Sequence, residues 1–305
     1  MDSWTFAVVA DMHVGTPRSW RFDPAAREQW QTARQQIVDL TPEYLLVAGD
    51  MTRDGLTHRF ELEEMKEDLD ALPFPYLITP GNHDVGDKFN LRCKARICRQ
   101  NLDLYNSVFP GSEYSVVHRN VRFSGFNSQL IASDLAEEAE LWAWMESQKA
   151  DPDVDHHVWM THVPLCLYQF ADDNHEPIGW NWYFSLDEPS RSRIVNALKA
   201  TDASLLLTGH THNRRELLHE GIRFQSLPAT SFPIPFDFDG EFSTDLGFML
   251  YTVSADSLES EFIPLAKKST LKGYGTTDYV APEDRDYSVV EEQPPLDITE
   301  QMYPL

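Results

Sequence analysis

The chain has 305 residues, of which 42% are hydrophobic, and its eight Trp and seventeen Phe can fill a sizeable core. This length allows one or two domains. The 49 acidic and 25 basic residues give a net charge of −24. This charge disfavours nucleic acid as the usual partner, because a phosphate backbone is bound by clustered Lys and Arg.

The cysteine count and the first residues predict the cellular setting. Cys93, Cys98 and Cys166 are too few, and odd in number, for a disulfide framework, so we expect a reducing compartment. The start of the chain lacks the basic and apolar regions of a signal peptide. No window approaches the ~18 consecutive apolar residues of a membrane span. These features predict a soluble, cytoplasmic protein with no membrane partner.

Strands and helices alternate in the first eighty residues. Apolar runs predict strands over residues 4–10, 44–48 and 76–79. Proline at the first helical position predicts a helix from Pro24, and a charged helix is expected over residues 57–72. This alternation is typical of βαβ units with parallel strand pairing.

The remainder of the chain predicts a second group of elements. A hairpin is expected over 114–126, and helices are expected around 135–145 and 194–198. Further strands are predicted over residues 158–161, 204–208, 222–227, 248–253 and 258–263. The last three strands have no long helices between them, which suggests a second, more antiparallel sheet. Residues 267–305 are rich in Gly, Thr, Asp, Glu and Pro and predict a C-terminal extension, so we expect a main domain over residues 1–266.

Four short fragments combine metal-ligating side chains, and each follows an apolar run. They are Asp11-Met12-His13, Gly49-Asp50, Gly81-Asn82-His83-Asp84 and Gly209-His210-Thr211-His212. Taken singly, several of them also fit ordinary strand-end turns. In open α/β sheets, however, ligands gather beyond the carboxyl ends of the strands, so four such fragments together predict one site.

The side chains of these fragments suit a pair of divalent first-row metal ions. Asp11 and His13 lie two residues apart and therefore point to the same side of an extended segment, as do His210 and His212. Asp50 can bridge two cations, and the amide oxygen of Asn82 can bind a metal without adding charge. The list of candidate ligands is Asp11, His13, Asp50, Asn82, His162, His210 and His212. His83 can donate a proton, and Asp84 can orient its imidazole.

The order of these fragments resembles that of the calcineurin-like metallophosphoesterase superfamily over residues 4–265. The resemblance implies an α/β fold, a four-layer α/β/β/α sandwich of two mixed sheets. It also implies that one metal is held by Asp11, His13, Asp50 and His212, and the other by Asp50, Asn82, His162 and His210. His83 would contact the substrate phosphate or protonate the leaving oxygen, supported by Asp84.

The residues after Gly49-Asp50 indicate which members of this superfamily the chain resembles. Purple acid phosphatases carry a Tyr ligand shortly after this dipeptide, whereas this chain continues Met51-Thr52-Arg53-Asp54-Gly55. That segment resembles bacterial class III cyclic-nucleotide phosphodiesterases and their glycerophosphodiesterase relatives.

We therefore expect hydrolysis of a small soluble phosphodiester by attack of a hydroxide that bridges two metal ions. The metals are Mn, Fe, Zn or Co, since Asp and His ligands suit all four. A phosphomonoesterase of the same fold is the alternative, and a nuclease or a non-catalytic scaffold is less favoured. A homo-oligomer is compatible with the sequence.

Two further segments are candidates for substrate specificity. Residues 163–184 are rich in aromatic side chains, which could stack on a substrate or simply pack on one another. Arg92, Lys94, Arg96 and Arg99 interrupt an otherwise acidic chain. They could attract a phosphate, or they could form a solvated helical face.

Overall fold

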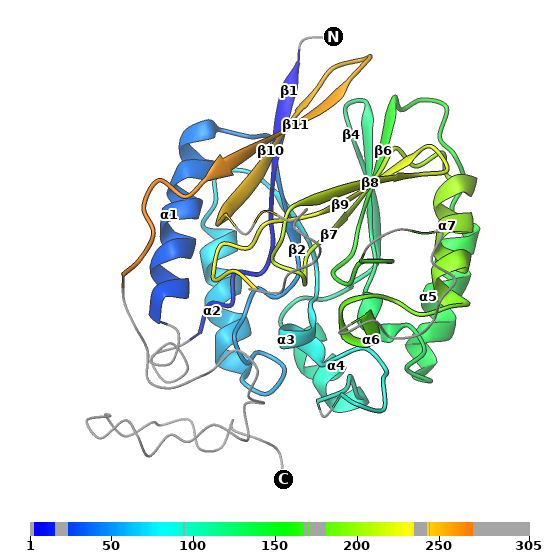
Figure 1. Cartoon of the computed structure of the whole chain (residues 1–305), viewed down its shortest axis with the longest axis horizontal. Coiled ribbons are helices and arrows are strands. Elements are labelled where there is room, and N and C mark those ends of the chain that lie inside the picture. The colour runs from blue at the N-terminus through cyan, green and yellow to red at the C-terminus, as the bar shows by residue number, and fades with distance from the viewer. Residues whose placement is uncertain are drawn as a thin grey trace.

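Two mixed β-sheets lie face to face in the computed structural model, which describes residues 3–15, 24–93, 95–167, 170, 181–234, 243 and 245–270 (Figure 1). The first sheet has the strand order β11-β10-β1-β2-β3. Its strands are β1 (Trp4–Val9), β2 (Tyr44–Ala48), β3 (Tyr76–Thr79), β10 (Gly247–Val253) and β11 (Leu258–Pro264). β1, β2 and β3 are parallel, as predicted, whereas β10 pairs with β1 in the antiparallel direction.

The second sheet has the order β4-β5-β6-β7-β9-β8. Its strands are β4 (Tyr114–His118), β5 (Val121–Gly125), β6 (His156–Met160), β7 (Leu205–Thr208), β8 (Arg215–His219) and β9 (Ile222–Ser226). The four central strands β5, β6, β7 and β9 are parallel, and an antiparallel strand closes each edge. The predicted hairpin over residues 114–126 is confirmed as β4 and β5.

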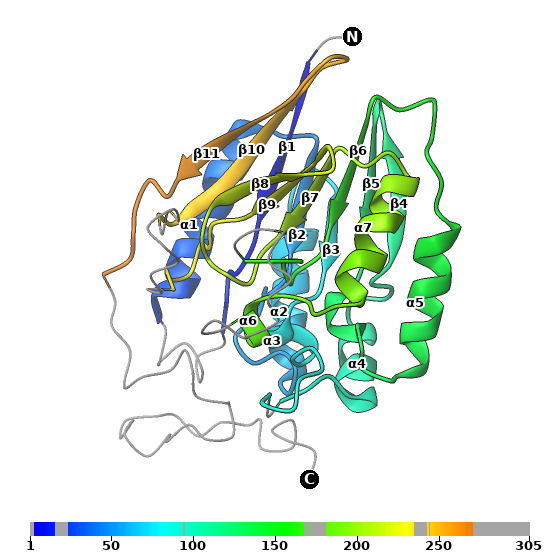
Figure 2. The ribbon, with the colours of Figure 1, turned by 45° about the vertical axis from the view of Figure 1, so that its right-hand side comes forward.

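Helices cover the outer faces of both sheets, which gives four layers (Figures 1 and 2). α1 (Pro24–Leu40) and α2 (Arg59–Asp70) lie beside the first sheet, and α5 (Ala136–Ser147) and α7 (Ser190–Ala200) beside the second. Shorter elements lie near one end of the sandwich: α3 (Asn82–Val85), α4 (Arg99–Asn106), α6 (Asn181–Phe184) and the 3-10 helix η1 (Ser128–Leu130). The predicted α/β/β/α architecture is confirmed.

Alternation of side chains along the strands explains this layering. In β1, Phe6 and Val8 pack between the sheets, while Ala7 and Val9 pack with the helices. Phe6 stacks on Tyr251 with ring centroids 4.7 Å apart. Strands that are buried on both faces read as continuous apolar runs, which is why they were visible in the sequence.

The expectation that the three late strands form one antiparallel sheet is wrong. β9 is parallel to β7 in the second sheet, whereas β10 and β11 extend the first. β10 pairs with β1, so Val253 lies opposite Trp4, and no local pattern reveals a pairing over such a distance. β8 and α4 were not predicted from the sequence.

The predicted boundary at residue 266 stays a prediction. β11 ends at Pro264, and residues 271–305 lie outside the described residues. None of the helices in the described part of the chain has the length and apolar character that a membrane crossing requires.

Candidate metal centre

Strand ends from both sheets bring the predicted ligands to one place. β1, β2 and β3 lead into Asp11, Asp50 and Asn82, while β6 and β7 lead into His162 and His210. Because these strands are parallel within each sheet, their carboxyl ends lie at the same edge of the sandwich.

The backbone at this edge adopts a conformation that L-residues rarely use. Asp11, His13, Asp50, His210 and His212 all have positive φ angles, between 47° and 70°. Such a conformation costs on the order of 1–3 kcal/mol per residue and persists only where the surrounding structure enforces it. Five such residues among seven candidate ligands indicate that the fold is built to turn these side chains toward a common point.

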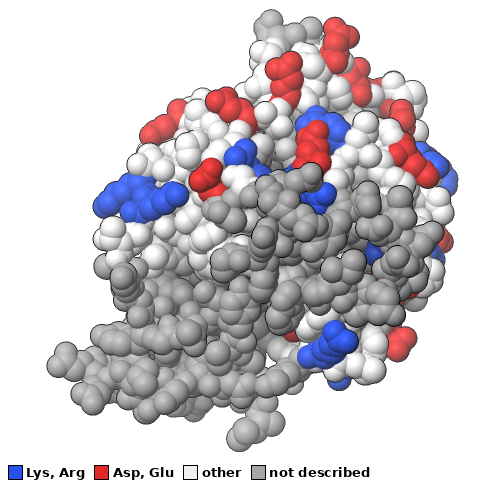
Figure 3. Space-filling view, in the orientation of Figure 1, with Lys and Arg blue, Asp and Glu red and all other residues white. Residues whose placement is uncertain are grey.

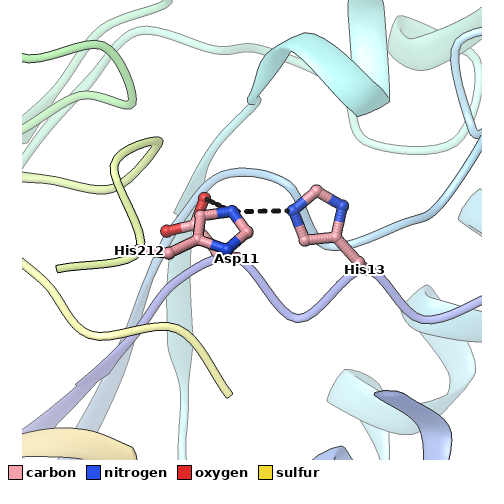
Figure 4. Close-up of side chains that lie close together, drawn as sticks. All are labelled: Asp11, His13 and His212. Atoms are coloured by element: carbon pink, nitrogen blue, oxygen red, sulfur yellow. Dashed lines mark hydrogen bonds and ion pairs between the residues drawn. The ribbon is translucent and has the colours of Figure 1, made fainter. Parts of the chain in front are cut away.

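Asp11, His13 and His212 form the first cluster, and their candidate ligand atoms lie within 4.8 Å of one another. The Nε2 atoms of His13 and His212 are 3.2 Å apart, and Nε2 of His212 is 3.4 Å from Oδ1 of Asp11. Figure 4 shows the two rings with nitrogen atoms facing each other beside the carboxylate. Nδ1 of His212 donates to the carbonyl of Phe232 at 2.6 Å, which leaves Nε2 for a ligand.

Asp50, His162 and His210 form the second cluster. Nε2 of His162 lies 3.3 Å from Oδ2 of Asp50 and 3.2 Å from Oδ1 of Asn82. Nδ1 of His162 donates to the carbonyl of Ala48 at 2.8 Å. The free ring nitrogen therefore faces two oxygen acceptors, an arrangement that requires a proton or a cation between them.

Asp50 links the two clusters. Its Oδ2 is 3.5 Å from Nε2 of His13 and 3.3 Å from Nε2 of His162, while Oδ1 accepts the backbone N–H of His83 at 2.8 Å. We call Asp11, His13, Asp50 and His212 the first half-site, and Asp50, Asn82, His162 and His210 the second half-site.

The pKa values of the candidate ligands are shifted by burial and by the closely spaced charged groups around them. Burial opposes the charge on Asp50, but His162 and His83 lower the pKa of this carboxyl well below its usual value. Burial would also lower the pKa of His162, yet Asp50 raises it to about 9. Burial and the neighbouring His83 lower the pKa of His13 well below its usual value. Carboxylates, neutral imidazoles and an amide oxygen together fit divalent first-row cations.

Comparison with known proteins places the chain in a family. The family model described as calcineurin-like phosphoesterase matches residues 5–214. The chain belongs to the calcineurin-like phosphoesterase family. This membership confirms the predicted superfamily and the prediction of a metal-dependent phosphoric ester hydrolase.

Individual members of the family are distant relatives. The chain is 24% identical to the serine/threonine-protein phosphatase CPPED1 of Danio rerio over 234 residues, which are 71% of this chain and 72% of the relative. It is 27% identical to the glycerophosphodiester phosphodiesterase GpdQ of Enterobacter lignolyticus over 206 residues, 64% of this chain and 65% of the relative. A purple acid phosphatase from yellow lupin seeds shares the fold, with a TM-score of 0.63 at 12% identity over 92% of this chain and 57% of the other.

Asp84 occupies a different place from the one predicted. Its buried carboxylate accepts hydrogen bonds from the backbone N–H groups of Met51, Thr52 and Gly81 and from the hydroxyl of Thr52. Nδ1 of His83 instead contacts the carbonyl of Arg53 at 2.7 Å. Asp84 therefore ties the segment after β2 to the turn after β3, and the predicted orientation of His83 by Asp84 is wrong. Burial and the charge of Asp50 raise the pKa of Asp84 to about 6.

Tyr183 and Asp87 touch the site and were not predicted as site residues. Nδ2 of Asn82 donates to the Tyr183 hydroxyl at 3.1 Å. Asp87 lies beside these two side chains, and burial and the charge of Asp50 raise its pKa to about 7. Tyr183 belongs to the aromatic segment noted in the sequence, but its spacing gave no sign of this contact.

The two candidate specificity segments meet near the site. Asn90 donates to the carbonyl of Trp182 at 3.4 Å, and the guanidinium carbon of Arg92 lies 5.3 Å from the centre of the Trp182 ring. Arg99 instead pairs with Glu137 on the surface. Lys94, Tyr168, His175 and Trp180 lie outside the described residues.

Proposed function

We propose that the chain hydrolyses a small phosphodiester with a dinuclear metal centre. The position of the Asp50 carboxylate carries this proposal, because one side chain within reach of both half-sites can serve two cations at once. The first half-site would hold one ion and the second half-site the other. When bound, two divalent ions lower the pKa of a water molecule to supply a nucleophile and neutralise the charge of the reacting phosphate.

His83 is suited to deliver a proton to the leaving oxygen. Its ring lies edge to face with that of His13, with centroids 4.5 Å apart, and it is less buried than the proposed ligands. Nδ1–H donates to the Arg53 carbonyl, which would support the charged imidazolium and hold Nε2 toward the substrate. We expect His83→Asn to lower kcat about 10²–10⁴-fold while the metal content remains unchanged.

A diester is favoured over a monoester because of the segment after Asp50. Met51 to Gly55 lacks the Tyr of purple acid phosphatases and resembles cyclic-nucleotide and glycerophosphodiester phosphodiesterases. The relative named as a glycerophosphodiester phosphodiesterase supports this choice. The relatives named as serine/threonine-protein phosphatases favour the alternative of a phosphomonoesterase.

The two activities are separated by comparing bis-(p-nitrophenyl) phosphate with p-nitrophenyl phosphate. Protein stripped with chelator is reloaded separately with Mn²⁺, Fe²⁺, Co²⁺ or Zn²⁺, and kcat/KM is measured for each substrate. We expect the diester to be the better substrate with the best metal. Cleavage of the monoester alone would overturn the diesterase proposal.

A nuclease is disfavoured by the distribution of charge. On the face drawn in Figure 3, the described Lys and Arg side chains are interspersed with Asp and Glu rather than gathered in one stripe. Elsewhere among the described residues, Lys and Arg side chains form ion pairs with acidic ones, as in Arg59–Glu63, Lys66–Asp70, Arg193–Glu146, Lys199–Glu220 and Arg223–Glu216. Together with the net charge of −24, this is unsuited to a phosphate backbone.

Asp50→Asn tests the bridging role and the scaffold alternative together. We expect the variant to bind fewer than two ions per chain and to lose most of its diesterase activity, because the amide lacks the charge that serves both half-sites. Metal content is measured by elemental analysis after gel filtration. Full activity in Asp50→Asn would refute the bridging role. Wild-type protein that stays well below two ions per chain with added Mn²⁺ would favour the scaffold.

A further inference from the structure

We propose that Tyr183 is a positioning residue that determines which atoms of Asn82 and His210 face the second half-site. The proposal rests on the function proposed above and extends it to a residue outside the ligand set. Tyr183 lies in α6, in the stretch between β6 and α7 rather than on either sheet, and Figures 1 and 2 show α6 beside α3, the helix that begins at Asn82.

The side-chain amide of Asn82 can present either its oxygen or its nitrogen to the site, and only the oxygen can bind a cation. Nδ2 carries two hydrogens. One is directed to the Tyr183 hydroxyl at 3.1 Å. This hydrogen bond occupies the nitrogen end of the amide and leaves Oδ1 facing Nε2 of His162 at 3.2 Å.

Tyr183 also sets the imidazole of His210 through its backbone. Nε2 of His210 lies 3.2 Å from the Tyr183 carbonyl, to which it donates, so the lone pair of Nδ1 is left for the site. The rings of Tyr183 and Phe184 lie 4.9 and 5.1 Å from that of His210 and restrict its rotation. One residue thus contacts two of the four members of the second half-site.

The first half-site is held differently. His212 is oriented by the carbonyl of Phe232, and the Asp11 carboxylate accepts the backbone N–H of His210 at 2.9 Å. Among the described residues, the hydrogen bonds of Tyr183 to the candidate ligands go to Asn82 and His210, both members of the second half-site. Loss of the Tyr183 hydroxyl should therefore weaken one of two metal sites and leave the other unchanged.

Tyr183→Phe removes the hydroxyl but keeps the ring and the carbonyl, so it tests the Asn82 contact alone. Stripped protein is titrated with Mn²⁺ in a calorimeter. We expect two binding events in the wild type. In the variant, the event that belongs to the second half-site should be 10–100-fold weaker, while the other event should be unchanged. The Mn²⁺ concentration for half-maximal diesterase activity should rise by the same factor, while kcat at saturating Mn²⁺ stays within about threefold.

Tyr76→Phe is the matched control, because the Tyr76 hydroxyl likewise makes a side-chain hydrogen bond, to the carboxylate of Asp70 at 2.7 Å on the surface. This control should leave both binding events unchanged. Circular dichroism of the stripped proteins checks that each variant is folded.

The outcomes separate this inference from the proposed function. A wild type that binds two ions and cleaves the diester, with a Tyr183→Phe variant whose two affinities remain within threefold, would overturn the positioning role alone. Equal weakening of both events would also overturn it. A wild type that binds fewer than two ions would overturn the proposed function instead.

Discussion

His157 should make the stability of the fold depend on pH below 6.5. This buried side chain is the second residue of β6, the strand that leads to His162; its Nδ1 donates to the Thr201 carbonyl at 3.1 Å, and its Nε2 lies 2.9 Å from the Ser124 hydroxyl. Burial, only partly offset by the Thr201 carbonyl, lowers the pKa of His157 to about 4. In the unfolded chain we expect an ordinary pKa near 6.5.

The sign follows from proton binding. Between pH 6.5 and 4 the unfolded chain binds more protons at this residue than the folded one, so stability falls as the pH falls through this window. Above pH 6.5 His157 is neutral in both the folded and the unfolded chain, so it no longer makes the stability depend on pH. The interval between a pKa of 6.5 and one of about 4 corresponds to about 3 kcal/mol in full, and to about 2–3 kcal/mol between pH 7.5 and 4.5.

The assay compares wild type with His157→Gln by urea denaturation of chelator-treated protein at pH 7.5 and 4.5. The variant should be less stable at pH 7.5 by about 1 kcal/mol, because it loses a well-formed hydrogen bond. Between the two pH values the wild type should lose about 2–3 kcal/mol more than the variant, since other titrating groups are common to both. Equal losses, within about 0.5 kcal/mol, would refute the reasoning.

Two further predictions concern the metal centre. Gly49→Ala should impair metal binding, whereas Gly221→Ala should not, although both glycines have φ of 83°. A Cβ added at Gly49 would lie 2.5 Å from Nδ1 of His162, whereas no atom lies within 4 Å of a Cβ added at Gly221. We expect about 1 kcal/mol from backbone strain in both variants, with loss of metal binding only in Gly49→Ala; equal metal affinity in the two would contradict the clash. Chelator should lower the melting temperature by about 4–5 °C for each site that had been loaded at about 100 times its Kd. A scan without any such shift would argue against bound metal in the folded protein.

The sequence by itself predicted the strands that form the frame of the site and the side chains that follow them. Buried parallel strands are continuous apolar runs, and ligands such as Asp50 and His162 come just after those runs. Because both features are local, the α/β class and the order of the ligands could be predicted without coordinates, and the resemblance of that order to a known superfamily implied the four-layer fold. The pairing of β10 with β1 could not, since it joins residues at opposite ends of the described chain.

Only the tertiary structure decided how each ligand is held. The carbonyls of Ala48 and Phe232 orient His162 and His212, Arg53 rather than Asp84 orients His83, and Tyr183 reaches Asn82 from 101 residues away. A hydrogen bond depends on distance and direction within a few tenths of an ångström. Such precision arises from packing between distant segments, so the sequence specified the chemistry of the site and the fold specified which atom of each side chain faces it.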